Sequence, residues 1–209
     1  MNACAWPRGS DRAIAARRPM AVQGGLRARW EGVCGRELTV EWQTGAKQAR
    51  GADARMDMTW VTDRIAVGGG IWTDDKMIEV VRAGVTHIID MQIEWDDTKL
   101  AEPYGVKVLW NPTDDDFRPK TPELFQRGVE FAIEALEDGD SKLFIHCAAG
   151  VHRAPMMTLA VLRATGWTLE DAIELIEIRR PVADFAQVYV DSVEEFMKNH
   201  EAAGANRRT

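Results

Sequence analysis

From about residue 59 onward, hydrophobic and polar residues follow one of two patterns, and segments of the two kinds alternate along the chain. Short runs of aliphatic and β-branched residues, typical of buried strands, occur at 65–67, 85–90, 104–110 and 142–146. Between and after them, apolar residues recur at helical spacing in the segments 74–83, 121–138, 155–165, 168–180 and 186–200. Strands that alternate with helices predict an α/β fold, with a central, mostly parallel sheet of about four to five strands flanked by helices.

The first 57 residues show neither pattern. They are rich in Arg, Ala and Gly, a composition that predicts a disordered extension. An alternative is a misassigned start, with the natural chain beginning at Met56 or Met58. We therefore expect one folded domain at 58–200, followed by a flexible tail at 201–209.

Charge and composition narrow the classes of partner. Residues 1–57 carry 10 Lys and Arg against 6 Asp and Glu, and the rest of the chain carries 16 against 27, a net charge of −11. Such an acidic body repels nucleic acid. No apolar run reaches the length of a membrane span or resembles a signal peptide, which favours the cytoplasm. The sequence does not indicate an oligomeric state.

The three cysteines are odd in number and widely spaced, so neither a disulfide framework nor a zinc site of paired cysteines is expected. One of them, Cys147, lies in the segment HCAAGVHRAP at 146–155. It follows a predicted buried strand and precedes a helix that begins at about Arg153. Backbone N–H groups in such a turn converge on one point, which makes an anion site and favours the thiolate. The residues that let the loop curl are Ala148, Ala149, Gly150 and Val151.

HCAAGVHR matches the HCxxGxxR signature of cysteine-dependent protein tyrosine phosphatases, and the order of elements from Trp60 to about His200 resembles the dual-specificity branch. The resemblance implies a phosphomonoester hydrolase that acts on a phosphorylated protein or small phosphomonoester, without metal or cofactor. Cys147 would attack phosphorus and form a phosphocysteine. Arg153 and the loop at 148–152, His152 included, would bind the phosphate oxygens.

The family mechanism also requires a general acid, usually some thirty residues before the cysteine. Asp114, Asp115 and Asp116 lie 33, 32 and 31 residues before Cys147, in a predicted turn. Neighbouring carboxylates disfavour one another's ionisation, which suits a group that must carry a proton. Relatives of the regenerating-liver type also have adjacent aspartates followed by a proline, which makes Asp115 the first choice and Asp114 and Asp116 the alternatives.

Two positions of the loop depart from the family pattern. Ala154 replaces the usual Ser or Thr, so the hydroxyl that would hydrogen-bond the cysteine sulfur is missing, and we expect slower breakdown of the phosphocysteine. His152 adds a titratable group at the rim. His146 is expected to orient the loop through a backbone hydrogen bond. A metal site of His146, Cys147 and His152 is disfavoured.

Three other functions stay open at this point. The segment CAAG followed by RAP is similar to the loop of plant glucan phosphatases, so a phosphorylated glucan is an alternative substrate. A catalytically weak, phosphate-binding pseudophosphatase is a second alternative. A sulfurtransferase of rhodanese type is a third, but it needs no acidic turn. Trp72 and Trp95 are candidates for the substrate rim, although tryptophans are more simply anchors of core and loops.

Overall fold

The computed structural model describes residues 27–31, 37–41 and 55–206, with side chains for 55–200. The chain forms two units, Met1–Asp53 and Ala54–Thr209. In the first unit β1 (Arg27–Glu31) pairs antiparallel with β2 (Glu37–Glu41). The rest of the segment predicted to be disordered lies outside the described residues, apart from 55–57, which belong to the second unit.

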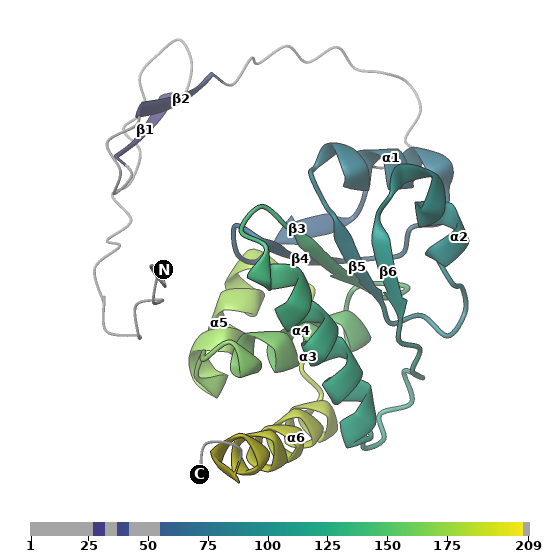
Figure 1. The fold of residues 1–209 in the computed structure, drawn as a ribbon, viewed down its shortest axis with the longest axis vertical. Helices are drawn as coiled ribbons and strands as arrows, with labels where there is room; N and C mark the ends of the chain where they lie inside the picture. Colours follow the sequence, from purple (N-terminus) through teal and green to yellow (C-terminus); the bar gives the residue numbers. More distant parts are fainter. Residues whose placement is uncertain (1–26, 32–36, 42–54, 207–209) are drawn as a thin grey trace. The chain divides into compact units, whose positions relative to one another are not determined.

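The second unit is built on a five-stranded sheet in the order β3-β4-β7-β5-β6 (Figure 1). The first strand pairs antiparallel with its neighbour, and all other pairs are parallel. The mostly parallel α/β sheet that the sequence predicts is therefore confirmed. The strands are β3 (Met58–Trp60), β4 (Ile65–Gly68), β5 (His87–Asp90), β6 (Lys107–Trp110) and β7 (Leu143–His146).

Helices cover both faces of this sheet (Figure 1). They are α1 (Asp74–Arg82), α2 (Thr98–Ala101), the 3-10 turn η1 (Glu102–Tyr104), α3 (Pro122–Glu137), α4 (Arg153–Ala164), α5 (Leu169–Arg179) and α6 (Gln187–Asn206). α6 thus runs into the segment predicted to be a flexible tail, and 207–209 lie outside the described residues. None of the helices in the described part of the chain is long and apolar enough to cross a membrane.

Alternate side chains of each strand enter two separate cores. Val67, Ile89 and Ile145 face the larger core, which α3, α4, α5 and α6 complete. Ala66 and Ile88 face the smaller core, which α1 closes from the other side. α4 is the most deeply placed helix, because every residue from Arg153 to Leu162 is buried. The chain that follows Cys147 is therefore anchored in the larger core.

Two strands differ from the sequence prediction. The segment 104–110, expected to be a buried strand, is shortened to β6 at the sheet edge, where none of its residues is fully buried. β3 was not predicted, because three residues are too few to show a period. The carboxyl ends of the four parallel strands share one edge of the sheet, as parallel register requires, and binding sites of α/β proteins usually lie at that edge.

Candidate active site

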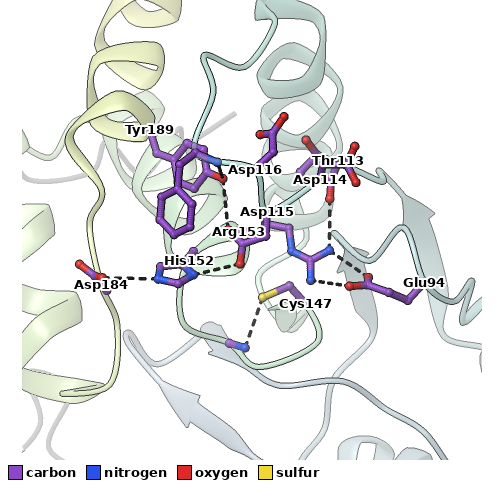
Figure 2. A network of polar contacts seen from close by, with 12 residues as sticks. Glu94, Thr113, Asp114, Asp115, Asp116, Cys147, His152, Arg153, Asp184 and Tyr189 are labelled. Carbon is purple, nitrogen blue, oxygen red and sulfur yellow. Dashed lines mark hydrogen bonds and ion pairs between the residues drawn. The ribbon is translucent and has the colours of Figure 1, made fainter.

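The loop between β7 and α4 curls around the sulfur of Cys147 (Figure 2). Cys147 is only 2% exposed. The backbone N–H of Gly150 donates a hydrogen bond to its Sγ at 3.2 Å. α4 begins at Arg153, so the positive end of its dipole lies next to the loop. The structure thus contains the strand, the curled loop and the helix start expected at this place.

The carbonyl groups of the loop are bonded to neighbouring segments. The backbone N–H of Gly70 donates to the carbonyl of Ala148 at 3.1 Å, and that of Asp184 donates to the carbonyl of Val151 at 2.9 Å. Ala149, between them, is exposed. Because the carbonyl oxygens are held by these partners, the loop N–H groups are left to face an anion.

Only glycine fits at position 150. Its φ of 65° lies in the left-handed region, which side chains with a Cβ rarely adopt. A Cβ there would lie 2.4 Å from Nη2 of Arg180 and 2.5 Å from the carbonyl oxygen of Gly68. The loop therefore packs directly against a neighbouring strand and a buried arginine, without room for a larger residue.

Arg180 supports the loop from behind. Its side chain is 3% exposed and donates from Nε to the carbonyl of Gly150 at 2.7 Å and from Nη2 to that of Ala149 at 3.3 Å. The other side of its guanidinium pairs with both carboxylate oxygens of Asp57, at 2.8 and 2.7 Å. The hydrogen bonds from Arg180 lower the pKa of Asp57. A residue just before β3 and the end of α5 thus fix the same loop.

Arg153 extends its guanidinium to the Cys147 side of the loop (Figure 2). Nη1 and Nη2 donate to the two oxygens of Glu94, each at 2.9 Å, and Nη1 also donates to the carbonyl of Thr113 at 3.2 Å. Within the described residues its buried Nε has no partner. Glu94 therefore orients the guanidinium by one edge and leaves the Nε–H as a donor for an anion.

Charges around Arg153 agree with this geometry. Burial alone would lower the pKa of Arg153. The hydrogen bonds to Glu94 and the nearby charges of Cys147 and Asp115 raise this pKa by more than burial lowers it, so the net shift is upward. The hydrogen bonds from Arg153 in turn lower the pKa of Glu94. Thiol, guanidinium and the Asp115 carboxylate are thus close enough to influence one another.

Asp115 is the one of the three aspartates that reaches the cysteine loop. Its Oδ2 accepts a hydrogen bond from Nδ1 of His152 at 2.9 Å, and its Oδ1 accepts one from the hydroxyl of Tyr189 at 3.1 Å (Figure 2). The far ring nitrogen of His152 lies 3.4 Å from the carboxylate of Asp184. Two donors therefore fix both oxygens of Asp115.

Phe117 shapes the turn that presents Asp115. Its φ of 54° is the only positive value at a non-glycine residue in the described part of the chain, and such values carry strain. Its backbone N–H donates to the hydroxyl of Tyr189 at 3.0 Å, and its ring stacks on Tyr189 and meets the ring of His152 edge-on. The strained turn is thus held by the same two side chains that hold Asp115.

All three aspartates are exposed, but Asp114 and Asp116 have other partners than Asp115. Oδ1 of Asp116 lies 2.5 Å from Nζ of Lys120 and also accepts from the backbone N–H of Arg118 at 3.2 Å. The hydrogen bond from Lys120 lowers the pKa of Asp116. This is opposite to the mutual rise expected for adjacent carboxylates, because the lysine outweighs its neighbours. Nζ of Lys120 also donates to the carbonyl of Asp114 at 2.8 Å.

The expectations for His146 and for the tryptophans were partly wrong. Among the described residues the ring nitrogens of His146 make no hydrogen bond, and the ring lies instead beside Asp90 and Asp97. His146, Cys147 and His152 do not gather as a metal-binding group, and the one such group among the described residues is Asp90, Asp97 and His146.

Trp72 and Trp95, at 45% and 52% exposure, are not core anchors.

Four residues of the site were missed by the sequence reasoning: Asp57, Glu94, Tyr189 and Arg180. Glu94, Tyr189 and Arg180 contact the cysteine loop or the acidic turn from distant parts of the sequence; Glu94, for example, is 59 positions from Arg153. Asp57 acts through its ion pair with Arg180. None belongs to the recognised signature. Only Arg180 had a visible signal in the sequence, since the pair Arg179 and Arg180 stands directly before Pro181 at the end of a predicted helix.

Known proteins resemble the chain in sequence and in fold. The family described as Dual specificity phosphatase, catalytic domain, matches residues 74–199. Dual specificity protein phosphatase 5 of Rattus norvegicus is 34% identical over 74 residues, which are 35% of this chain and 19% of that protein. Dual specificity protein phosphatase 26 of Rattus norvegicus is 30% identical over 107 residues, 50% of this chain and 51% of that protein. The chain thus spans less than two thirds of the length of these curated relatives.

Among solved structures, PTPMT1 in complex with PI(5)P superimposes with a TM-score of 0.64 at 22% identity, over 71% of this chain and 99% of that one. Identity at this level shows the fold alone. The family match covers more than half of the 209 residues and includes the acidic turn, the cysteine loop and α4. The chain therefore belongs to the dual specificity phosphatase catalytic domain family, within the cysteine-based protein tyrosine phosphatases.

Proposed function

We propose that this protein is a tyrosine or dual-specificity protein phosphatase that hydrolyses phosphomonoesters through a phosphocysteine on Cys147. The observation that carries the proposal is the arrangement of Cys147, Arg153 and Asp115 around one curled loop, with the Nε–H of Arg153 unpartnered among the described residues (Figure 2). A dianionic phosphate would be bound by Arg153 and by the N–H groups of residues 148–152. Neither step of the proposed reaction uses a metal or a cofactor.

In the first step the Cys147 thiolate attacks phosphorus in line, and the bond between phosphorus and the leaving oxygen breaks. Asp115 gives its proton to that oxygen. Arg153 and the loop N–H groups stabilise the equatorial oxygens in the transition state. The product alcohol or phenol leaves, and phosphorus stays bonded to sulfur.

In the second step water attacks phosphorus, Asp115 accepts a proton from it, and the thiolate departs. The contacts of Asp115 suit this step, because His152 and Tyr189 donate to both of its oxygens and orient it as a carboxylate. In the first step one of these contacts has to open, because a protonated oxygen must point to the substrate. Asp115 therefore has the geometry of a base before substrate binds.

The proposed substrates are phosphorylated proteins. A phosphorylated glucan is the second candidate, because flat aromatic surfaces stack on sugar rings. Three exposed tryptophans lie at or just after the carboxyl ends of three parallel strands, on the sheet edge where Cys147 lies. These are Trp72, Trp95 and Trp110, at 45%, 52% and 44% exposure. An inositide such as the PI(5)P bound to PTPMT1 is less favoured, since Ala148, Ala149 and Val151 add no positive charge to the loop.

The test compares phenyl phosphate with p-nitrophenyl phosphate as substrates of the wild type, C147S and D115N, with D114N and D116N as matched controls. We expect C147S to abolish turnover of both. D115N should lower kcat/KM, which reports the first step, by about 10²–10⁴-fold for phenyl phosphate and much less for p-nitrophenyl phosphate, whose leaving group needs no proton. D114N and D116N should stay within about twofold of the wild type, since a carboxylate outside the site contributes no proton transfer.

Acid quenching followed by mass spectrometry should detect phosphate on the peptide that contains Cys147. Residual turnover in C147S, or an equal loss in D115N and D116N, would contradict the proposed roles. Phosphate binding without turnover would indicate a pseudophosphatase, and turnover of thiosulfate a sulfurtransferase. A panel of phosphotyrosine peptides, phosphothreonine peptides, inositides and phosphoglucans then ranks the substrate classes by kcat/KM.

A further inference from the structure

A second group of ionisable side chains is buried behind the cysteine loop. Asp90 ends β5, His146 ends β7, and Asp97 directly precedes α2; all three side chains have 0% exposure. Asp90 and His146 are register partners on neighbouring parallel strands. Nε2 of His146 lies 3.2 Å from Oδ2 of Asp97 and 3.9 Å from Oδ1 of Asp90. One ligand atom from each residue lies within 4.8 Å of the other two.

The charge of this group is not balanced by the protein. Two carboxylates face one imidazole, and within the described residues neither Asp90 nor Asp97 pairs with a lysine or arginine. Buried carboxylates are costly unless they are paired or bind a cation.

The contact between His146 and Asp97 does not have the geometry of a hydrogen bond. Among the described residues, neither ring nitrogen of His146 and neither carboxylate oxygen of Asp97 has a hydrogen-bond partner, although the two groups are 3.2 Å apart. Donor and acceptor therefore do not point at each other. Ligand atoms that share an ion about 2.1 Å away lie about 3.0–3.5 Å from one another without pointing at each other. The 3.2 Å between His146 and Asp97 falls within this range, and the 3.9 Å between His146 and Asp90 is slightly longer.

The carboxylate of Asp90 is already oriented by the backbone. Its Oδ1 accepts from the N–H of Gln92 at 2.9 Å, and its Oδ2 accepts from the N–H of Asp97 at 3.2 Å. Outer hydrogen bonds of this kind fix the ligands of metal sites. The side chain of Gln92 is also fully buried, and both of its amide atoms lack a partner in the described part of the chain. Unsatisfied polar atoms are thus concentrated in this one region.

We propose that Asp90, Asp97 and His146 form a binding site for a divalent transition-metal cation. One imidazole and two carboxylates suit Zn²⁺ or Mn²⁺ better than Ca²⁺ or Mg²⁺, which prefer oxygen ligands alone. The ion would join β5, β7 and the start of α2, and one of its ligands directly precedes Cys147 in the chain. Its role is to fix the strand ends that carry the catalytic loop, and it does not contact the phosphate.

The test titrates metal into the full chain after treatment with a chelator and dialysis. Zn²⁺ and Mn²⁺ are added separately against a chromophoric competitor, and bound metal is counted by elemental analysis. C147S is the reference protein, because it removes the other zinc-binding candidate, the thiolate. We expect about one equivalent to bind C147S, at least a tenfold weaker affinity in D97N and D90N made on that background, and no change in D116N. Metal should raise the Tm of C147S but not that of D97N.

Either of two results would overturn the proposal: C147S binds neither metal at stoichiometric level, or D97N and D90N bind as well as their parent. If both variants fail to fold, the visible spectrum of Co²⁺ in C147S decides. A spectrum of protein-bound cobalt supports the site, and that of aqueous cobalt refutes it. Since metal binding and Tm are the readouts, the outcome is independent of whether the protein proves to be a phosphatase.

Discussion

At the scale of single residues, Ala154 distinguishes this cysteine loop from the family pattern. It is the second residue of α4, has 0% exposure, and lies in the larger core together with Cys147. Its carbonyl accepts a hydrogen bond from the hydroxyl of Thr158 at 2.8 Å, and that hydroxyl satisfies only the backbone. Position 154 therefore offers no donor to the sulfur when it leaves phosphorus.

We predict that A154S accelerates the breakdown of the phosphocysteine. A hydroxyl that donates to the departing thiolate contributes about 1 kcal/mol, which is roughly a fivefold rate increase. Rapid-quench kinetics with p-nitrophenyl phosphate would show a smaller accumulation of phosphoenzyme and a higher steady-state kcat. A154G serves as the control, because it changes the size of the side chain without adding a donor. Equal phosphoenzyme levels in A154S and the wild type would contradict the prediction.

His152 is the other residue whose effect can be isolated. Its Nδ1–H orients Asp115 at 2.9 Å, so H152A should lower kcat/KM for phenyl phosphate, which reports the first step, by about tenfold, the value of one hydrogen bond to a charged group. The loss should be smaller for p-nitrophenyl phosphate, which needs little help from an acid. H152N places an amide N–H near the position of Nδ1 and should restore most of the activity. A loss of the same size for both substrates would mean that His152 acts on phosphate binding instead.

At the scale of elements, the ion pair of Arg180 and Asp57 joins the end of α5 to the segment before β3 and supports the cysteine loop. Arg180 is buried, whereas the Asp57 side chain is 54% exposed, so solvent screens part of the attraction. We predict that D57N lowers the free energy of unfolding at pH 7 by about 1–3 kcal/mol, because the buried guanidinium loses its charged partner.

The same variant should change the response to acid. Arg180 holds the pKa of Asp57 in the folded protein below its unfolded value of about 4. This stabilisation is therefore present above pH 4 and is lost as the pH falls through the folded pKa. Urea unfolding between pH 7 and pH 2.5 should show the difference between wild type and D57N shrinking below pH 4. D63N, at an exposed position, should follow the wild type throughout, and a D57N difference that stays constant with pH would contradict the argument.

Local sequence patterns were sufficient to predict those parts of the fold and of the site whose residues are close together in the chain. The strand, the small residues and the helix around Cys147 are adjacent in the chain, and the acidic turn lies at a fixed spacing before them. The supports of the loop could not be predicted, because the contact of Arg180 with Asp57 joins residues 123 positions apart. β6 was misjudged because a run of apolar residues does not show which strand lies at the edge of the sheet.

At the scale of the whole molecule, the site is assembled from segments spread over most of the second unit. The loops after β5, β6 and β7 contribute Glu94, Asp115 and Cys147, and α6 contributes Tyr189. The first residues of the unit contribute as well. The main-chain N–H of Met56 lies 2.7 Å from an oxygen of Glu79, and the carbonyl of Asp57 accepts from the N–H of Gly69 at 2.9 Å. The position at which the folded unit begins therefore affects the cysteine loop.

We predict that a chain beginning at Met56 is more stable and more active than one beginning at Met58. The shorter chain lacks Asp57, and it also lacks Met56, which is only 9% exposed. Loss of the burial and of the ion pair should together cost about 2–4 kcal/mol. Urea unfolding measures this difference. kcat/KM should fall in the shorter chain, because Arg180 then holds the carbonyl of Gly150 without its own partner.

D57N in the chain that begins at Met56 separates the two contributions. If the ion pair dominates, this variant should match the chain from Met58 in both stability and kcat/KM. If the burial of Met56 dominates, the variant should keep most of the stability and lose mainly activity. Equal stability and activity of the two shortened chains would refute the prediction and would show that the cysteine loop is supported by Arg180 alone.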